Sequence, residues 1–70
     1  MNNKTIFGKN VKMLREERGL GQIELAEILQ VSKGIISMWE NGLSDPKMSS
    51  LIALSKFFDC TIDYLVGLED

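Results

Sequence analysis

Histidine is absent from this chain, and cysteine occurs only once, as Cys60. Without histidine the commonest acid–base group of enzymes is missing, and one thiol cannot supply the several ligands of a zinc site. The glycines also lie outside the spacing of a phosphate-binding loop. The sequence therefore predicts no enzymatic activity, no metal ion and no cofactor.

Cys60 cannot form an intramolecular disulfide, because the chain has no second cysteine. That is typical of a protein that works in the reducing cytoplasm. A lone cysteine is more often a small buried hydrophobic residue than a reactive thiol, so we expect Cys60 to be buried.

Linkers and long apolar runs are also missing. Proline occurs once, as Pro46, and no segment is rich in glycine, serine or proline. The first residues lack the apolar run of a signal peptide, and no apolar stretch approaches the ~20 residues that span a bilayer. Hydrophobic residues make up 44% of the 70 residues, which is enough for one small core. We expect a single domain over residues 1–70, with its core between residues 6 and 67.

Positive charge is in short supply, because the net charge is −2. That disfavours nucleic-acid binding at first sight. The charges are unevenly spread, however: residues 1–34 carry six basic and four acidic side chains, whereas residues 35–70 carry two basic and six acidic ones. Such asymmetry can leave a basic face on an acidic protein.

Apolar residues recur at spacings of three and four along most of the chain, and no segment shows sustained alternation of apolar and polar residues. This periodicity predicts an all-α fold with helices over 6–18, 22–29, 33–41 and 48–58 and a short fifth helix after residue 61. The expected core residues are Phe7, Val11, Leu14, Leu25, Ala26, Leu29, Ile36, Trp39, Leu51, Leu54, Phe58 and Leu65.

Residues that typically cap or end helices support these boundaries. Gly19 is placed to end the first helix in a left-handed conformation. Ser32 and Thr61 are placed to accept the first unpaired backbone N–H groups of the third and fifth helices. Asn41-Gly42 is a stop signal for the third helix.

The second and third helices are separated by a turn of only a few residues, which is the arrangement of a helix-turn-helix. The surrounding motifs stand in register with it: Leu14-Arg15, Gly19-Leu20, Gln22, Leu25-Ala26, Val31-Ser32, Ile36-Ser37, Trp39-Glu40-Asn41-Gly42, Pro46, Leu51, Leu54 and Asp63-Tyr64-Leu65. With these motifs the chain resembles the Cro and phage-repressor type of helix-turn-helix domain, the XRE-like regulators of bacteria and phages. The resemblance implies a compact, five-helix, lambda-repressor-like DNA-binding domain.

The resemblance also implies DNA contacts from the helix-turn-helix. Gln22 matches the glutamine that opens the family's second helix, contacts the DNA backbone and supports the recognition helix. The outward positions of the recognition helix, which face base edges or phosphates, are matched by Lys33, Gly34, Ser37 and Met38. Gly34 would bring backbone close to DNA without reading a base, and Met38 would pack on a thymine methyl or on a neighbouring helix.

Further family positions are matched after the recognition helix. Asn41, Gly42 and Ser44 match a loop that touches phosphates, and Lys47 adds a charge beside it. Arg15 and Glu40 match an arginine–glutamate pair that ties the first helix to the third. We interpret that pair as structural, and Arg15 is also a candidate for a phosphate contact.

Two departures from the family pattern concern the backbone. Gly21 stands where the family usually has Ser or Thr, so it caps the second helix without a side-chain bond, at a cost of a few tenths of a kcal/mol. Gln30 stands where the family often has Gly. If Gln30 adopts a left-handed conformation, that costs about 1 kcal/mol.

The implied function is sequence-specific binding of double-stranded DNA by a small transcriptional regulator, most simply a repressor that occupies an operator as a homodimer. Two half-sites would each receive one copy. A weak apolar patch is available for the dimer, because Phe57 and Phe58 cannot both face the core; it consists of Phe57, Thr61, Tyr64 and Leu68.

The alternative is a protein-interaction module, such as an antitoxin or an anti-repressor. Ile23 and Ile28 replace residues that are commonly polar in the family, and they mark a possible contact surface. Leu43 and Asp45 stand where related repressors often carry Lys or Arg. The acidic C-terminal half points the same way, and the two functions can coexist.

Overall fold

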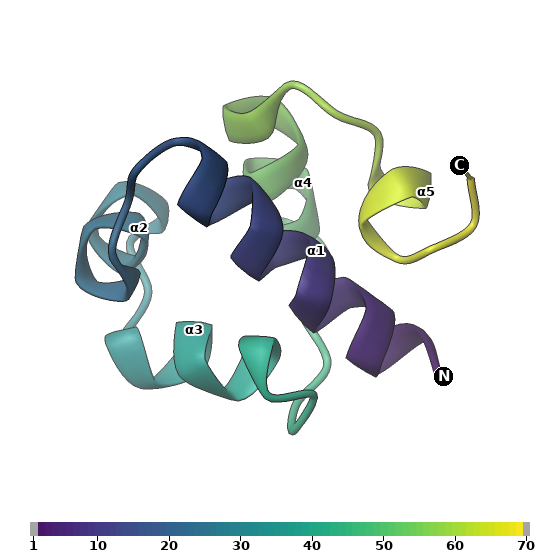
Figure 1. Cartoon of the computed structure of the whole chain (residues 1–70), viewed down its shortest axis with the longest axis horizontal. Coiled ribbons are helices and arrows are strands. Elements are labelled where there is room, and N and C mark those ends of the chain that lie inside the picture. The colour runs from purple at the N-terminus through teal and green to yellow at the C-terminus, as the bar shows by residue number, and fades with distance from the viewer. Residues whose placement is uncertain (1, 70) are drawn as a thin grey trace.

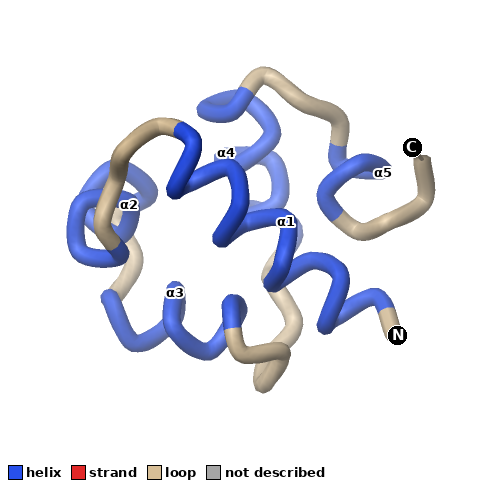
Figure 2. Tube along the Cα trace, in the orientation of Figure 1, coloured by secondary structure: helices blue, strands red, loops and turns tan. Residues whose placement is uncertain are grey.

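The computed structural model describes residues 2–69, and these residues form five α-helices without a strand among them (Figure 2). The helices are α1 (Asn3–Glu17), α2 (Gln22–Leu29), α3 (Lys33–Glu40), α4 (Met48–Phe58) and α5 (Ile62–Leu65). Helix α1 runs through the middle of the molecule, and the other four helices surround it (Figure 1). The predicted all-α fold is confirmed. None of the helices within residues 2–69 is long and apolar enough to cross a membrane.

Helix α1 begins three residues earlier than predicted. The side chain of Asn2 accepts a hydrogen bond from the backbone N–H of Thr5, at 2.9 Å. Asparagine is among the best N-cap residues, but the apolar periodicity starts only at Ile6, so the pattern placed the start one turn too late. At the other end Gly19 has φ +69°, which confirms the left-handed glycine expected there.

The remaining helices agree closely with their predicted bounds. Ser32 and Thr61 cap α3 and α5 as predicted, by accepting from the backbone N–H groups of Ile35 and Tyr64. Helix α3 is one residue shorter than predicted, because Asn41 is its C-cap and the chain turns away at a left-handed Gly42.

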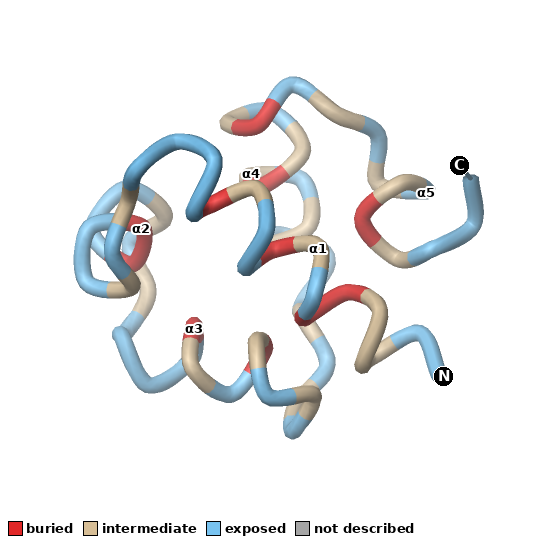
Figure 3. The backbone as a smooth tube through the Cα atoms, viewed as in Figure 1, coloured by how far each residue is buried: buried red, intermediate tan, exposed pale blue. Residues whose placement is uncertain are grey.

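Nine apolar side chains form the buried core, and they come from all five helices: Phe7, Val11, Leu25, Ala26, Ile36, Trp39, Leu54, Phe58 and Leu65. On α3 the buried positions lie on the side that faces α1 (Figure 3). Three expected core residues, Leu14, Leu29 and Leu51, are only partly buried and pack against this core. A domain of this size has too little volume to enclose every apolar side chain.

Cys60 is also partly rather than fully buried, which corrects the prediction. It follows the left-handed Asp59 that ends α4, so it lies at the margin of the core. Burial, together with the charges of Asp59 and Glu69, raises the pKa of the Cys60 thiol. The thiol is therefore protonated at neutral pH, as expected of an unreactive cysteine.

Gly8 allows α1 and α3 to approach each other closely. A Cβ atom at this position would overlap the carbonyl oxygen of Trp39. Beside this contact the rings of Phe7 and Trp39 pack edge to face, with centroids 5.6 Å apart. Because Gly8 has no side chain, the backbone of α1 can lie directly against the end of α3.

Candidate nucleic-acid interface

The turn between α2 and α3 consists of residues 30–32. Gln30 adopts φ 58° and ψ 44°, so it is left-handed, and the cost of about 1 kcal/mol considered for that conformation applies. The next N–H, from Val31, donates to the carbonyl of Ala26 at 3.0 Å, and Ser32 then starts α3. This sharp reversal sets α3 at an angle to α2 (Figure 1).

Helix α3 has one buried and one open face. Ile36 and Trp39 are buried in the core, whereas Lys33 and Met38 are exposed and Ser37 is half-buried. Gly34 is exposed too, and a Cβ atom there would have only the Ser32 hydroxyl within 4 Å, at 3.8 Å. The fold therefore does not require glycine at position 34, but its absence of a side chain leaves room for a close approach from outside.

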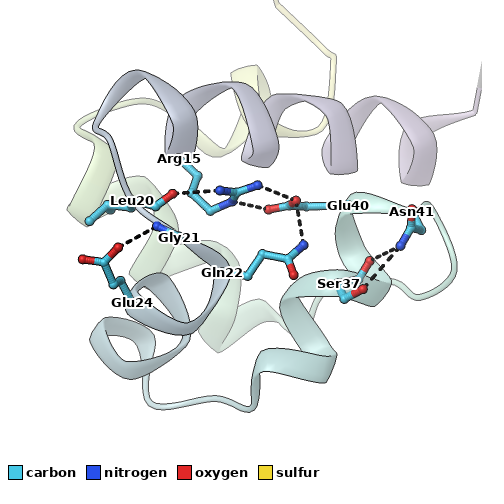
Figure 4. A network of polar contacts seen from close by, with 8 residues as sticks. All are labelled: Arg15, Leu20, Gly21, Gln22, Glu24, Ser37, Glu40 and Asn41. Atoms are coloured by element: carbon cyan, nitrogen blue, oxygen red, sulfur yellow. Dashed lines mark hydrogen bonds and ion pairs between the residues drawn. The ribbon is translucent and has the colours of Figure 1, made fainter.

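A buried network fixes the C-terminal end of α3 (Figure 4). Nε and Nη2 of Arg15 donate to the two carboxylate oxygens of Glu40, at 2.7 and 3.0 Å, and Nη1 donates to the carbonyl of Leu20 at 2.7 Å. Nε2 of Gln22 donates to the same carboxylate at 3.1 Å. The network joins α1, α2 and α3, because each helix contributes one side chain.

The electrostatics keep this network charged. Burial by itself raises the pKa of Glu40, but the hydrogen bonds from Arg15 and Gln22 and the charge of Arg15 outweigh it, so the pKa is lowered. The hydrogen bond to Glu40 raises the pKa of Arg15, against the opposing effect of burial. Both groups are therefore ionised at neutral pH, in a bidentate pair with little access to solvent.

The hydrogen-bonding groups of Arg15 and Gln22 are thus largely occupied by partners within the protein. Only 8% of Arg15 is exposed, and three of its five N–H groups are already bonded. Gln22 is half-buried and spends one amide hydrogen on Glu40. Within residues 2–69 the second amide hydrogen and the carbonyl oxygen of Gln22 have no partner, so they are available to a ligand outside the protein.

The expected phosphate-contacting residues after α3 differ in how open they are. Lys47 is exposed, but Gly42 is half-buried and lies against Thr5. The hydroxyl oxygen of Ser44 is buried and has no hydrogen-bond partner among residues 2–69. The Asn41 side chain is turned onto Ser37, with Nδ2 at 2.9 Å from its carbonyl oxygen and 3.4 Å from its hydroxyl oxygen.

Two residues contribute to this site in ways that the sequence did not predict. Gly8 sits within the apolar pattern of α1, and nothing local indicates its contact with α3. The carboxylate of Glu24 accepts from the N–H of Gly21 at 2.8 Å, which places a negative charge at the start of α2 (Figure 4). A cap residue followed three positions later by glutamate is the usual signal for this contact, but the glycine at the cap conceals it.

The sequence of this chain is similar to those of known proteins. The helix-turn-helix family profile matches residues 11–65. The HTH-type transcriptional activator BcrR of Enterococcus faecalis is 45% identical over 64 residues, which are 91% of this chain and 31% of that protein. Antitoxin PezA of Streptococcus pneumoniae is 32% identical over 89% of this chain and 39% of that protein.

A solved structure is similar over almost its whole length. The crystal structure of the P22 c2 repressor in complex with a synthetic operator superimposes with a TM-score of 0.85 at 31% identity, covering 91% of this chain and 97% of that one. The chain spans a half or less of the curated relatives BcrR, ImmR and the c2 repressor. On the match over residues 11–65 and the five-helix architecture, the chain belongs to the helix-turn-helix family.

Proposed function

We propose that this chain is a DNA-binding domain that recognises a specific duplex sequence and regulates transcription in the cytoplasm, as a repressor that blocks an operator. One observation carries the proposal. The open face of α3 is held by the buried Arg15–Glu40–Gln22 network on a fold similar to a repressor solved with its operator. A rigid helix with a free polar face is suited to the major groove.

The proposed contacts fall into two groups. Lys33, Ser37 and Met38 face base edges, and Gly34 allows the helix to lie deep in the groove. The DNA backbone is contacted around this helix by Gln22, Lys47, the segment Asn41, Gly42 and Ser44, and the remaining N–H groups of Arg15.

We further propose that two copies bind two half-sites. A single small module buries about 600–1,000 Å² on DNA, which is little for a strong site. The molecule measures 27 × 24 × 22 Å, so two copies can lie side by side when their recognition helices are about 34 Å apart. Leu68 is exposed and Tyr64 half-exposed in the proposed patch, whereas Phe57 lies partly under the Arg18 guanidinium, 5.4 Å from the ring centroid.

A second candidate function is binding of a partner protein, as in an antitoxin. Ile23 and Ile28 on α2 support it, because 61% and 46% of these residues are exposed. The similarity to an antitoxin adds to this case. If this function holds, Ile23→Ser should abolish capture of the partner while leaving DNA binding unchanged.

Selection from a random duplex library tests the main proposal, with the affinity for the recovered sequence then measured at several salt concentrations. We expect an inverted repeat, and we expect Lys47→Ala, which removes a proposed phosphate contact, to reduce the salt slope by about one unit. Lys56→Ala is the matched control, since Lys56 is also an exposed lysine and lies near the end of α4, the end of that helix away from α3 (Figure 1). Recovery of no common sequence, or equal effects of the two substitutions, would refute the proposal.

A further inference from the structure

The outer side of α1 carries a stripe of exposed residues that the proposed DNA contacts do not include. These residues line one shallow hollow, and we call them the α1 stripe: Lys9, Lys12, Met13, Glu16 and Glu17. Residues three or four apart on a helix are neighbours on one face, so the five side chains form a continuous surface. The exposed segments of α1 are pale blue in Figure 3.

The two signs of charge are separated along the α1 stripe. Both lysines come first, Met13 lies in the middle with 39% of its surface exposed, and both glutamates follow. At about 1.5 Å per residue, Lys9 and Glu17 each lie about 6 Å from Met13 along the helix axis, on opposite sides of it. One half of the stripe is therefore basic and the other half is acidic.

Contacts within the protein do not explain this order of charges. A helix is stabilised by acidic residues at its N-terminus and basic ones at its C-terminus, but α1 has no acidic residue in its first turn and ends in Glu16 and Glu17. Lys12 precedes Glu16 by four residues, which is the weaker order for such a pair. Among residues 2–69 the four charged side chains of the stripe form no ion pair. Their charges are therefore available to a partner outside the chain.

We propose that the α1 stripe binds the α1 stripe of a second copy, with the two helices antiparallel. When Met13 of one copy faces Met13 of the other, each basic half lies against an acidic half, so every charge meets an opposite one. A parallel arrangement would place lysine against lysine, so the charge pattern selects a pair with two-fold symmetry. The antiparallel arrangement also brings the positive N-terminal half of each helix beside the glutamates of the other copy.

This contact is separate from the pairing that we propose on DNA. That pairing uses the apolar patch around Tyr64 and Leu68, which lies outside the α1 stripe. The inference therefore does not depend on DNA binding. Where both contacts form, the two surfaces together link one DNA-bound pair to the next.

The oligomeric state in the absence of DNA tests the inference. Sedimentation equilibrium is measured at protein concentrations up to about 1 mM, because exposed ion pairs are individually weak. The unaltered protein should form a dimer at the upper concentrations. Lys9→Glu combined with Lys12→Glu makes the stripe wholly acidic, so the dissociation constant should rise by about tenfold or more. Glu16→Lys combined with Glu17→Lys makes the stripe wholly basic and should have the same effect.

Exchanging all four charges gives the sharpest control. This quadruple variant keeps the net charge of −2 and again places each basic half against an acidic half, so it should associate about as well as the unaltered protein. Its charge order also suits the helix dipole, so α1 should be retained. Lys4→Glu combined with Lys56→Glu changes the net charge as much as reversal of the two lysines of the stripe does, but at other positions, and should weaken association much less.

The outcomes separate this inference from the proposed function. An unaltered protein that is monomeric at every concentration would overturn the inference, as would a dimer that survives both reversals or a quadruple variant that stays monomeric. Each of these results leaves the DNA-binding proposal standing, because the assay contains no DNA. A dimer that responds as expected, in a protein that selects no DNA sequence, would support the inference while the proposed function fails. Circular dichroism of each variant verifies that the helices are retained.

Discussion

Replacing Glu40 by glutamine tests whether the buried ion pair holds the recognition helix. The side chains of Arg15 and Glu40 are only 10% and 4% exposed. Glutamine keeps the shape of Glu40 but removes its charge and turns one acceptor oxygen into a donor, which must then face a donor of Arg15 or Gln22. Removing one partner of a buried pair costs about 3–5 kcal/mol, because the other charge is left uncompensated.

That loss is large for a domain of this size. The total free energy of unfolding of 70 residues is about 4–10 kcal/mol. We therefore expect Glu40→Gln to lower Tm by about 12 °C or more. Urea unfolding followed by the fluorescence of Trp39, which is the single tryptophan and is 2% exposed, measures the change directly.

The double variant Arg15→Met with Glu40→Met is the matched control. It removes both charges and leaves apolar side chains of similar length, so it should be more stable than Glu40→Gln. A loss below about 1 kcal/mol in Glu40→Gln would refute the reasoning, because the pair would then behave like an exposed one. A double variant less stable than Glu40→Gln would refute it as well.

Three further predictions concern stability. Gly8→Ala should lower the free energy of unfolding by about 1–3 kcal/mol, because its Cβ would meet the Trp39 carbonyl. Gly34→Ala, where the space is open, should raise it by up to about 1 kcal/mol. Urea unfolding of both variants measures the two changes, and equal effects would contradict the prediction. Gln30→Gly should stabilise by about 1 kcal/mol, since Gln30 has φ 58°, and a lower Tm would contradict this. The pKa of Glu40 is lowered in the folded protein, so its contribution to stability should be complete above its ordinary pKa of 4.5. This contribution should be lost as the pH falls through the lower pKa of the folded state. The free energy of unfolding measured from pH 3 to 7 should show this dependence in the unaltered protein but not in Glu40→Gln.

The charges around α3 suggest how strongly the domain depends on a second copy. Lys33 and Lys47 are exposed near the proposed DNA face, but so are Asp45 and Glu24, the latter at the start of α2. Few cations and two nearby carboxylates imply a small salt slope and weak binding by one copy. Under the proposed function, we therefore expect tight binding to depend on the proposed pairing of two copies on two half-sites.

Local patterns predicted all five helices, apart from the start of α1, and the open face of α3. Apolar spacing and the caps at Ser32 and Thr61 depend on neighbours in the chain, and the structure confirms them. The start of α1 was missed because Asn2 caps it a full turn before the first apolar residue of the pattern. The arginine–glutamate pair was expected from the family resemblance, since Arg15 and Glu40 are 25 residues apart and no local pattern joins them.

The sequence by itself therefore determined that the chain is a five-helix helix-turn-helix domain and which side of α3 is polar, because periodicity and capping act over a few residues. Only the tertiary structure decided how closely α1 approaches α3 at Gly8, and that Gln22 joins the buried ion pair. It also decided that the Asn41 amide is turned onto Ser37. These features depend on which surfaces meet and on which donor finds which acceptor, and packing in three dimensions sets both.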